Sequence, residues 1–429
     1  MDEAREFLAR GEFDRAKHAY LIALFRDRYN REGMLGLGEA FAGLRDYQSA
    51  RTVFAQAAAR HPDSSHAHSS LGGVLLELDD LEGARAAFER ALALQPGLRK
   101  PWAGLGIVYE RQGDIARADR AWREAFRQGG PAVSAYRGSG EPLRVLVLSS
   151  AVGGNVPLEP VFDDRIFQVL TLFAESYHED MPLPAHDVVF SVVGNAELST
   201  RAVDKAEMMM AATNAPAINH PALVRRTGRV EVADRLRDVP GIVTPRMHLV
   251  RKAELRDDRG LGWPLLVRAL GFHGGEHFVK VDVPEDLPAA VATLEGDEVL
   301  AIEYLDTRNR DGRFRKYRML AIDGRLYAAH LAISRDWKVH YFSAQHGGLA
   351  DDEEGAFLAD PQAGVGRDAL HALERAAALL ALDYAGFDFT LDADGRVVLF
   401  EANATMRIGA NADAIAAVQA MIAGRVRSS

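Results

Sequence analysis

The chain has 429 residues, of which 48% are apolar and 26% charged, so it can build several cores and is not extensively disordered. The net charge of −10 disfavours binding to nucleic acid through the overall field, and the absence of cysteine excludes disulfides and thiolate metal sites. The first residues show no secretory signal, and no apolar run reaches the ~18 residues of a membrane-spanning helix. We expect a multidomain cytoplasmic protein that binds neither nucleic acid nor membrane.

Three segments within the first 130 residues repeat with a period of 34 residues and align without gaps. Each carries an aromatic residue at the same position of its second helix, namely Phe54, Phe88 and Trp122. Glycine and alanine recur around them, so two antiparallel helices approach closely while the aromatic side chain fills the gap to the next repeat. A partial copy with Ala16 and Tyr20 lies one period earlier. The pattern resembles the tetratricopeptide repeat.

This resemblance implies an all-α solenoid over residues 1–130. Stacked repeats of this kind bury a continuous core and offer a concave face that binds a peptide or a protein partner. Two alternatives stay open: an array that packs only against the rest of its own chain, and one that joins two copies into a homodimer.

The composition changes after residue 130. Residues 131–142 are rich in glycine, proline and serine and end the helical periodicity, which predicts a linker. The apolar segments at 143–150 and 186–194 predict buried parallel strands, and residues 163–177 between them predict a helix. We therefore expect an open α/β domain over residues 143–224.

Glycines and asparagines near the ends of these strands are candidate ligand contacts. Gly153 and Gly154 follow the first strand and fit either a phosphate site at a helix N-terminus or a tight turn. Asn195 and Asn219 follow the later strands, at the edge where open α/β sheets bind their ligands.

A glycine-rich hairpin is predicted over residues 263–281, WPLLVRALGFHGGEHFVKV. Two apolar strands flank a loop that contains Gly271, Gly274 and Gly275. Such a tip can lay backbone N–H groups over the phosphates of a nucleotide. Another buried strand is predicted at 298–307, EVLAIEYLDT.

The last predicted hairpin, over residues 384–406, carries a set of hard oxygen ligands. Glu401 and Asn403 point to one face because side chains alternate along a strand, and the hairpin can bring Asp388 beside them. Mg²⁺ prefers such ligands when phosphate oxygens complete its shell. The alternatives are an ordinary exposed hairpin and carboxylates that are satisfied within the core.

Residues 143 to about 425 resemble the ATP-grasp superfamily, whose members include D-alanine–D-alanine ligases, glutathione synthetases and ribosomal-protein glutamate ligases. The resemblance rests on VRALGFHGGEHFVKV, IEYLD, GFDF and FEANATM. It implies that the α/β domain at 143–224 is followed by a central subdomain at 225–305 and a C-terminal subdomain at 306–429. The expected fold class is thus a multidomain chain, with an all-α repeat solenoid followed by an α/β (α+β) ATP-grasp fold.

The resemblance also implies roles for single residues. Asp388, Glu401 and Asn403 would hold Mg²⁺, and Arg318 would neutralise the phosphoryl group in transfer. Arg335 lies near the expected acceptor pocket and suits a substrate carboxylate. The residues expected at ATP are Arg229, Arg268, Gly271, His273, Gly274, Gly275, Lys280, Glu303, Tyr304, Leu305 and Asp306. Arg229 and Arg268 replace the family's usual lysines and keep the positive charge.

The activity that the resemblance implies is ATP-dependent ligation of a carboxylate to an amine through an acyl phosphate, with ATP and Mg²⁺ as cofactors. The substrate would be a small molecule or a peptide, and the repeats would dock a partner or a peptide-like substrate. Two alternatives stay open, a small-molecule kinase and a scaffold with a non-catalytic module that senses nucleotide.

Overall fold

The computed structural model describes residues 1–272, 275–339 and 349–428. The chain divides into two compact units, one of residues 1–132 with 175–178 and one of residues 133–174 with 179–429. Each unit is described by itself. Short 3-10 turns join several elements, η1 (Glu159–Val161), η2 (Ala174–Ser176), η3 (Arg225–Thr227), η4 (Lys252–Glu254) and η5 (Pro284–Asp286).

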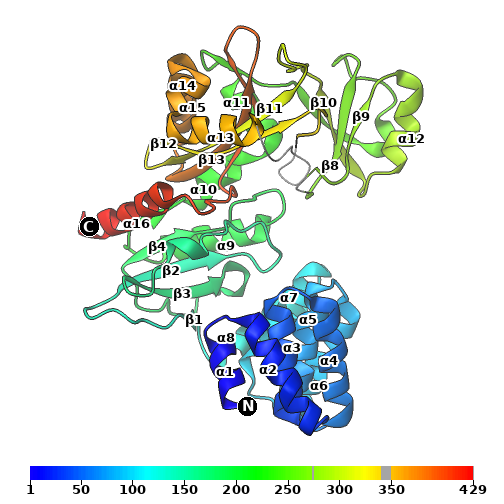
Figure 1. The fold of residues 1–429 in the computed structure, drawn as a ribbon, viewed down its shortest axis with the longest axis vertical. Helices are drawn as coiled ribbons and strands as arrows, with labels where there is room; N and C mark the ends of the chain where they lie inside the picture. The colour runs from blue at the N-terminus through cyan, green and yellow to red at the C-terminus, as the bar shows by residue number, and fades with distance from the viewer. Residues whose placement is uncertain (273–274, 340–348, 429) are drawn as a thin grey trace. The chain divides into compact units, whose positions relative to one another are not determined.

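The first unit is an array of antiparallel helix pairs, drawn in blue and cyan in Figure 1. Its helices are α1 (Asp2–Ala9), α2 (Phe13–Arg26), α3 (Arg31–Gly43), α4 (Tyr47–Arg60), α5 (Ser65–Glu77), α6 (Leu81–Leu94), α7 (Arg99–Arg111) and α8 (Ile115–Arg127). The predicted order of helical repeats followed by a mixed α/β region is confirmed.

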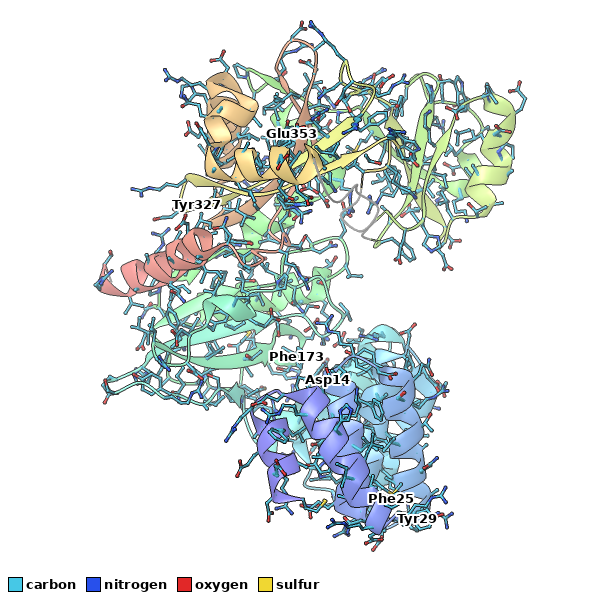
Figure 2. All side chains as sticks on the ribbon, in the orientation of Figure 1. Asp14, Phe25, Tyr29, Phe173, Tyr327 and Glu353 are labelled. Carbon is cyan, nitrogen blue, oxygen red and sulfur yellow. The ribbon has the colours of Figure 1, made fainter. Side chains whose placement is uncertain are left out.

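The helix starts follow the same period as the core. Asp46, Asp80 and Asp114 are N-caps of α4, α6 and α8, and each carboxylate accepts a hydrogen bond from the backbone N–H three residues later. Such a cap contributes about 1 kcal/mol, because it satisfies a donor that the helix leaves unpaired. Helix α2 departs from its neighbours, since its Phe25 is 94% exposed and lies at the outer end of the helix (Figure 2).

The second unit begins with a sheet in the order β1-β3-β2-β4-β5, in which β3 and β4 run parallel to β2. The strands are β1 (Ala132–Val133), β2 (Leu143–Ser149), β3 (Phe167–Phe173), β4 (Val188–Ser191) and β5 (Ala217–Ile218), with the helices α9 (Thr200–Ala211) and α10 (Pro221–Val224). The helix predicted over 163–177 is wrong, because its centre is β3. β3 pairs over seven residues with β2 and joins the sheet, and this pairing overrides a local pattern that fits either element.

A second sheet, in the order β7-β10-β8-β9, carries the glycine-rich hairpin. Its strands are β7 (Met247–Arg251), β8 (Leu265–Ala269), β9 (Phe278–Val281) and β10 (Glu298–Glu303), and α12 (Leu287–Ala292) packs beside β9. β8 and β9 pair antiparallel, so the predicted hairpin strands are present on both sides of the loop.

The third sheet has the order β12-β11-β13-β14-β6. Its strands are β6 (Ile242–Val243), β11 (Phe314–Ile322), β12 (Arg325–Ser334), β13 (Tyr384–Leu391) and β14 (Val397–Asn403). Asp323 and Gly324 both have positive φ at the turn between β11 and β12, as the predicted Asp-Gly hairpin turn requires.

Helices cover both faces of the third sheet (Figure 1). α11 (Arg229–Leu236), α13 (Leu349–Ala359), α14 (Pro361–Val365) and α15 (Arg367–Leu380) share one core with it. On the other face, α16 (Ala412–Arg427) packs with Leu320 and Tyr384 and also with Val145 and Phe190 of the first sheet. This shared core fixes the loop after β14 against the loops of the first sheet. Within the described ranges, no helix is both long enough and apolar enough to cross a membrane.

Two adjacent glycines of α5 offer a matched test of the repeat packing. A Cβ on Gly72 would lie 2.7 Å from two ring atoms of the buried Phe88, whereas a Cβ on Gly73 meets no atom within 4 Å. We expect Gly72→Ala to destabilise α5 and α6 by about 1–3 kcal/mol through overpacking. Gly73→Ala should stabilise the same helices by up to about 1 kcal/mol through helix propensity.

Hydrogen exchange of peptides from 65–94, measured by mass spectrometry on the full chain, reports both changes. Equal effects of the two substitutions would contradict the close Gly72–Phe88 packing.

Candidate functional site

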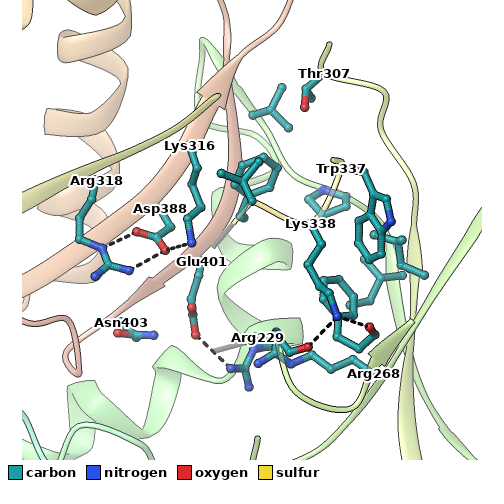
Figure 3. A pocket seen from close by; sticks show the side chains of 18 of the residues that line it. Arg229, Arg268, Thr307, Lys316, Arg318, Trp337, Lys338, Asp388, Glu401 and Asn403 are labelled. Atoms are coloured by element: carbon teal, nitrogen blue, oxygen red, sulfur yellow. Dashed lines mark hydrogen bonds and ion pairs between the residues drawn. The ribbon is translucent and has the colours of Figure 1, made fainter. Parts of the chain in front are cut away.

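Three strands of the third sheet place charged side chains in one row. Arg318 on β11 is paired in register with Asp388 on β13, which is paired with Glu401 on β14. Residues that lie directly opposite one another on neighbouring strands share a face of the sheet, so the three side chains meet (Figure 3). A β-bulge after Asp388 inserts Phe400 as an extra residue of β14, and Phe400 also lines the cavity in front of the row.

Asp388 is a buried carboxylate held by two cations. Its Oδ1 and Oδ2 accept hydrogen bonds from Nε and Nη2 of Arg318 at 2.6 and 2.8 Å, and Nζ of Lys316 lies 3.2 Å from Oδ2. Burial alone would raise the pKa of Asp388, but Lys316 and Arg318 outweigh burial and lower this pKa to about 2. The carboxylate is therefore ionised at neutral pH.

Glu401 is linked to the start of helix α11. Nη2 of Arg229, the first residue of that helix, donates to Glu401 Oε1 at 3.1 Å, and Nη1 of Arg229 donates to Glu197 at 3.3 Å. Asn403 lies two residues after Glu401 on the same strand, and its Oδ1 accepts hydrogen bonds from the backbone N–H and the hydroxyl of Thr405.

The donor set fits a hard divalent cation. Asp388 and Glu401 lie side by side, arginine and lysine side chains are their partners, and Asn403 adds an amide oxygen to the same cavity. Mg²⁺ binds such oxygens and completes its shell with phosphate oxygens and water. In the described part of the chain, no group of three or more His, Asp or Glu side chains is arranged to hold a metal ion.

The row faces a cavity of about 530 Å³. Seven arginine and lysine residues line this cavity but only three aspartate and glutamate residues, so its wall is positively charged. The cations are Arg229, Arg268, Arg315, Lys316, Arg318, Lys338 and Arg407, and the acids are Glu303, Asp388 and Glu401. A cavity with this balance attracts an anionic ligand.

Arg268 on β8 is a partly buried cation of this cavity wall. Its Nη2 donates to the carbonyl of Phe272, and its guanidinium lies 5.3 Å from the centroid of the Phe278 ring. Its Nε is buried and has no hydrogen-bond partner among the described residues. Burial and the positive charge of Arg229 lower the pKa of Arg268 to about 10. A buried cation of this kind is stabilised by a bound anion.

The glycine-rich hairpin is tied to the segment that follows β12. Nζ of Lys338 donates to the carbonyls of Gly275 and Phe278 at 3.0 and 3.2 Å. Trp337 packs its ring edge-to-face on Phe278, with 5.2 Å between the ring centroids (Figure 3). Lys338 therefore fixes one wall of the cavity.

Apolar side chains line another part of the cavity, among them Met247, Leu266 and Ile302. Glu303, at the end of β10, is held by Arg246 in a pair of hydrogen bonds that lowers the pKa of this carboxyl. Asp306 is paired in the same way with Arg308, which lowers its pKa. Both acids of the segment expected at adenine and ribose thus already have an arginine partner.

The structure brings most of the predicted site residues to this cavity. Those that line it are Arg229, Arg268, Gly275, Glu303, Tyr304, Leu305, Arg318, Asp388, Glu401 and Asn403. Lys280, Asp306 and Arg335 line a neighbouring open groove, which shares Tyr304 with the cavity. Gly271 lines neither and forms a turn with a φ of 78°. His273 and Gly274 lie outside the described residues.

The candidates in the first sheet have structural partners. Gly153 and Gly154 have positive φ and make a turn that leads into irregular chain, so the helix N-terminus considered for them is absent there, but Gly154 does line the cavity. Asn195 Oδ1 accepts from the backbone N–H groups of Glu197 and Leu198. Asn219 is fully buried and bonds to both backbone polar groups of Tyr384, which ties the first sheet to β13.

Sequence reasoning missed Lys338, Phe400 and Arg407, all of which line the cavity. It placed Lys316 only in a basic turn that could attract an anionic substrate, whereas the structure puts this residue on β11, two positions before Arg318 and on the same face. No signal marked Lys338 or Arg407, since both follow strands in irregular segments.

Comparisons with known proteins identify the repeats. The tetratricopeptide repeat family model matches residues 1–53 and 35–98. The structure of MamA from Desulfovibrio magneticus RS-1 is 24% identical, with a TM-score of 0.28, and the match covers 30% of this chain and 72% of that one. No curated protein sequence matches the chain.

Two further solved structures match the region after the repeats. The D-alanine–D-alanine ligase from Coxiella burnetii is 12% identical, with a TM-score of 0.44, and the match covers 67% of this chain and 96% of that one. The ligase of the same name from Bacillus anthracis, complexed with ATP, is 14% identical over the same shares, with a TM-score of 0.42.

Two arginines of the cavity should affect stability with opposite signs. We expect Arg318→Leu to lower the free energy of unfolding by about 3 kcal/mol, because Asp388 loses a partner while it stays buried. Arg268→Leu should raise the free energy of unfolding of the unliganded protein by about 1 kcal/mol, because it removes an unsatisfied buried donor. Urea unfolding followed by tryptophan fluorescence compares the two, and a shift in the same direction for both would contradict this assignment.

Proposed function

We propose that the chain is an ATP-dependent ligase that joins a carboxylate to an amine through an acyl phosphate. The observation that carries this proposal is the row of Arg318, Asp388 and Glu401, which faces a positively charged cavity. Asp388, Glu401 and Asn403 would hold Mg²⁺, which when bound neutralises phosphate charge and orients the phosphates.

The cavity wall matches the parts of a nucleotide. The apolar side chains Met247, Leu266 and Ile302 suit a base, and the excess of arginine and lysine suits a triphosphate. The unpaired Nε of Arg268 supplies a buried donor for a phosphate oxygen. The hairpin that Lys338 holds lies at the same cavity and would cover the phosphates with backbone N–H groups.

The proposed chemistry needs no nucleophile from the protein. A substrate carboxylate oxygen attacks the γ-phosphorus, the bond from that phosphorus to the β-phosphate oxygen breaks, and ADP leaves. The amine nitrogen then attacks the acyl carbon, the bond to the phosphate oxygen breaks, phosphate leaves, and the nitrogen loses a proton. Arg318 stands beside Asp388 to neutralise the phosphoryl charge as it develops.

The repeats would serve this activity by docking a partner or a peptide-like substrate. Tetratricopeptide repeats occupy the N-terminal region, and stacked helix pairs present a continuous surface to an extended ligand.

Glu401→Gln tests the catalytic role of the row. The substitution keeps the shape of the side chain but removes its charge, so magnesium-dependent ADP release should fall about 100-fold or more. Asp394→Asn is the matched control, because Asp394 is an exposed acid in the turn at the other end of the same hairpin. The assay measures ADP released with pooled amino acids, followed by mass spectrometry of the products. Unchanged turnover in Glu401→Gln would contradict the proposed site.

Hydroxylamine separates a ligase from the two alternatives. It attacks an acyl phosphate to give a hydroxamate, so the wild-type chain with ATP, Mg²⁺ and its acid substrate should form hydroxamate without any added amine. A kinase that phosphorylates a hydroxyl group would release ADP and form a stable phosphate ester. A nucleotide-sensing scaffold would bind ATP without turnover, and either result would refute the ligase.

A further inference from the structure

Helix α2 carries a stripe of large apolar side chains on its exposed face. Leu21, Ile22, Phe25 and Tyr29 are 47%, 63%, 94% and 43% exposed. Leu21, Ile22 and Phe25 lie at helical spacing on α2, opposite the face that buries Tyr20, and Tyr29 lies three residues beyond the last residue of that helix, Arg26. Figure 2 labels Phe25 near the C-terminal end of α2 and Tyr29 in the turn that follows it. Water thus contacts a continuous apolar strip, which is unfavourable unless the strip has a partner.

The fold of the helical repeat does not require large apolar side chains at these positions. One, two and three periods later, the position of Phe25 is occupied by Ala59, Ala93 and Arg127. The position of Ile22 is occupied by Gln56, Arg90 and Glu124. Later second helices therefore carry small or polar residues there, and packing between repeats does not explain the large side chains of α2.

Arginines without acidic partners lie at the C-terminal end of the stripe. Arg26, Arg28 and Arg60 take part in no ion pair within the described part of the array. The guanidinium of Arg60 lies 4.2 Å from the centroid of the Tyr29 ring, and that of Arg28 lies 5.7 Å from it. Several basic side chains elsewhere in the array pair with an acid three residues earlier, as in Arg5–Asp2, Arg15–Glu12, Lys17–Asp14, Arg85–Glu82 and Arg117–Asp114.

Both acids of residues 13–30 already have a partner. Asp14 pairs with Lys17 at 2.8 Å, and Asp27 accepts a hydrogen bond from the side chain of Asn30. The local surface is therefore apolar along its centre and keeps a net positive charge at its C-terminal end, because Asp27 offsets only one of the three arginines.

We propose that this surface, the α2 face of Leu21, Ile22, Phe25, Tyr29, Arg26, Arg28 and Arg60, docks an acidic amphipathic segment of a partner protein. Apolar side chains of the partner would cover Ile22 and Phe25, and its carboxylates would pair with the three arginines. Aromatic and arginine side chains are the residue types that most often anchor such contacts.

Charge disfavours two other occupants. A second copy bound through the same face would bring the three unpaired arginines of each copy together, since a two-fold contact joins like to like. A membrane with anionic lipids would meet a chain with a net charge of −10, whereas a short peptide experiences the local field within a Debye length of about 8 Å.

The experiment measures fluorescence anisotropy of a labelled helical peptide titrated with the full chain. The probe carries leucine along one face and glutamate along its flanks, and a second probe replaces every glutamate with lysine. We expect the acidic probe to bind at least about tenfold more tightly than the basic probe, with an affinity that falls as salt rises.

Two variants locate the contact. The double substitution Ile22→Ser and Phe25→Ser and the charge reversal Arg28→Glu should each weaken binding of the acidic probe about tenfold. Ile115→Ser is the matched control, because Ile115 is a 42% exposed apolar residue on α8 of the same array. This variant should bind the acidic probe as tightly as the wild-type chain does. Circular dichroism checks that the helical content of each variant is unchanged.

Four outcomes would overturn the proposal. The first three are equal binding of both probes, no binding of the acidic probe, and unchanged binding in both α2 variants. The fourth is a chain that does not bind the acidic probe but self-associates, or binds phosphatidylserine vesicles, through Phe25. ADP release by the α2 variants separates this proposal from the proposed enzyme, since neither result depends on the other.

Discussion

The ion pairs of Asp388 with Arg318 and Lys316 are the constraint on which the rest of the site depends. A buried carboxylate is tolerated only when cations and hydrogen bonds offset its desolvation, and both cations come from β11, the strand paired with β13. The register of these strands is thereby tied to the charge balance of the cavity. Because β14 pairs in register with β13, the same constraint places Glu401 beside Asp388 and Asn403 at the end of the row.

The arginine and lysine residues that line the cavity outnumber its aspartate and glutamate residues. Two arginines illustrate how this excess of positive charge arises. Arg229 begins a helix and is shared by two glutamates, whereas Arg268 lies on a hairpin strand with a buried nitrogen that has no partner among the described residues. A bound anion would offset the cost of this buried nitrogen and its positive charge. Lys338 differs from these two arginines, because its Nζ donates hydrogen bonds to backbone carbonyls of the glycine-rich hairpin.

The parts of the fold that follow a simple period were predictable from the sequence. The 34-residue repeat located the helix pairs, and alternation along the last hairpin put Glu401 and Asn403 on one face. β3 was not predictable, because the local pattern of Phe167–Phe173 fits a helix as well as a strand and only pairing with β2 decides. The ion pairs of Lys316 with Asp388 and of Arg229 with Glu401 were not predictable either, since each pair joins segments far apart in the sequence.

The central claim, that Asp388 and Glu401 hold a divalent cation that carries a nucleotide, is tested most directly by crystals grown with Mn²⁺ and a non-hydrolysable ATP analogue. Mn²⁺ replaces Mg²⁺ at oxygen sites and is located by its anomalous scattering. The account predicts an anomalous peak bonded to Asp388 and Glu401, with the phosphates of the analogue against Arg268 and the glycine hairpin. A peak elsewhere, or a nucleotide bound away from these carboxylates, would contradict it.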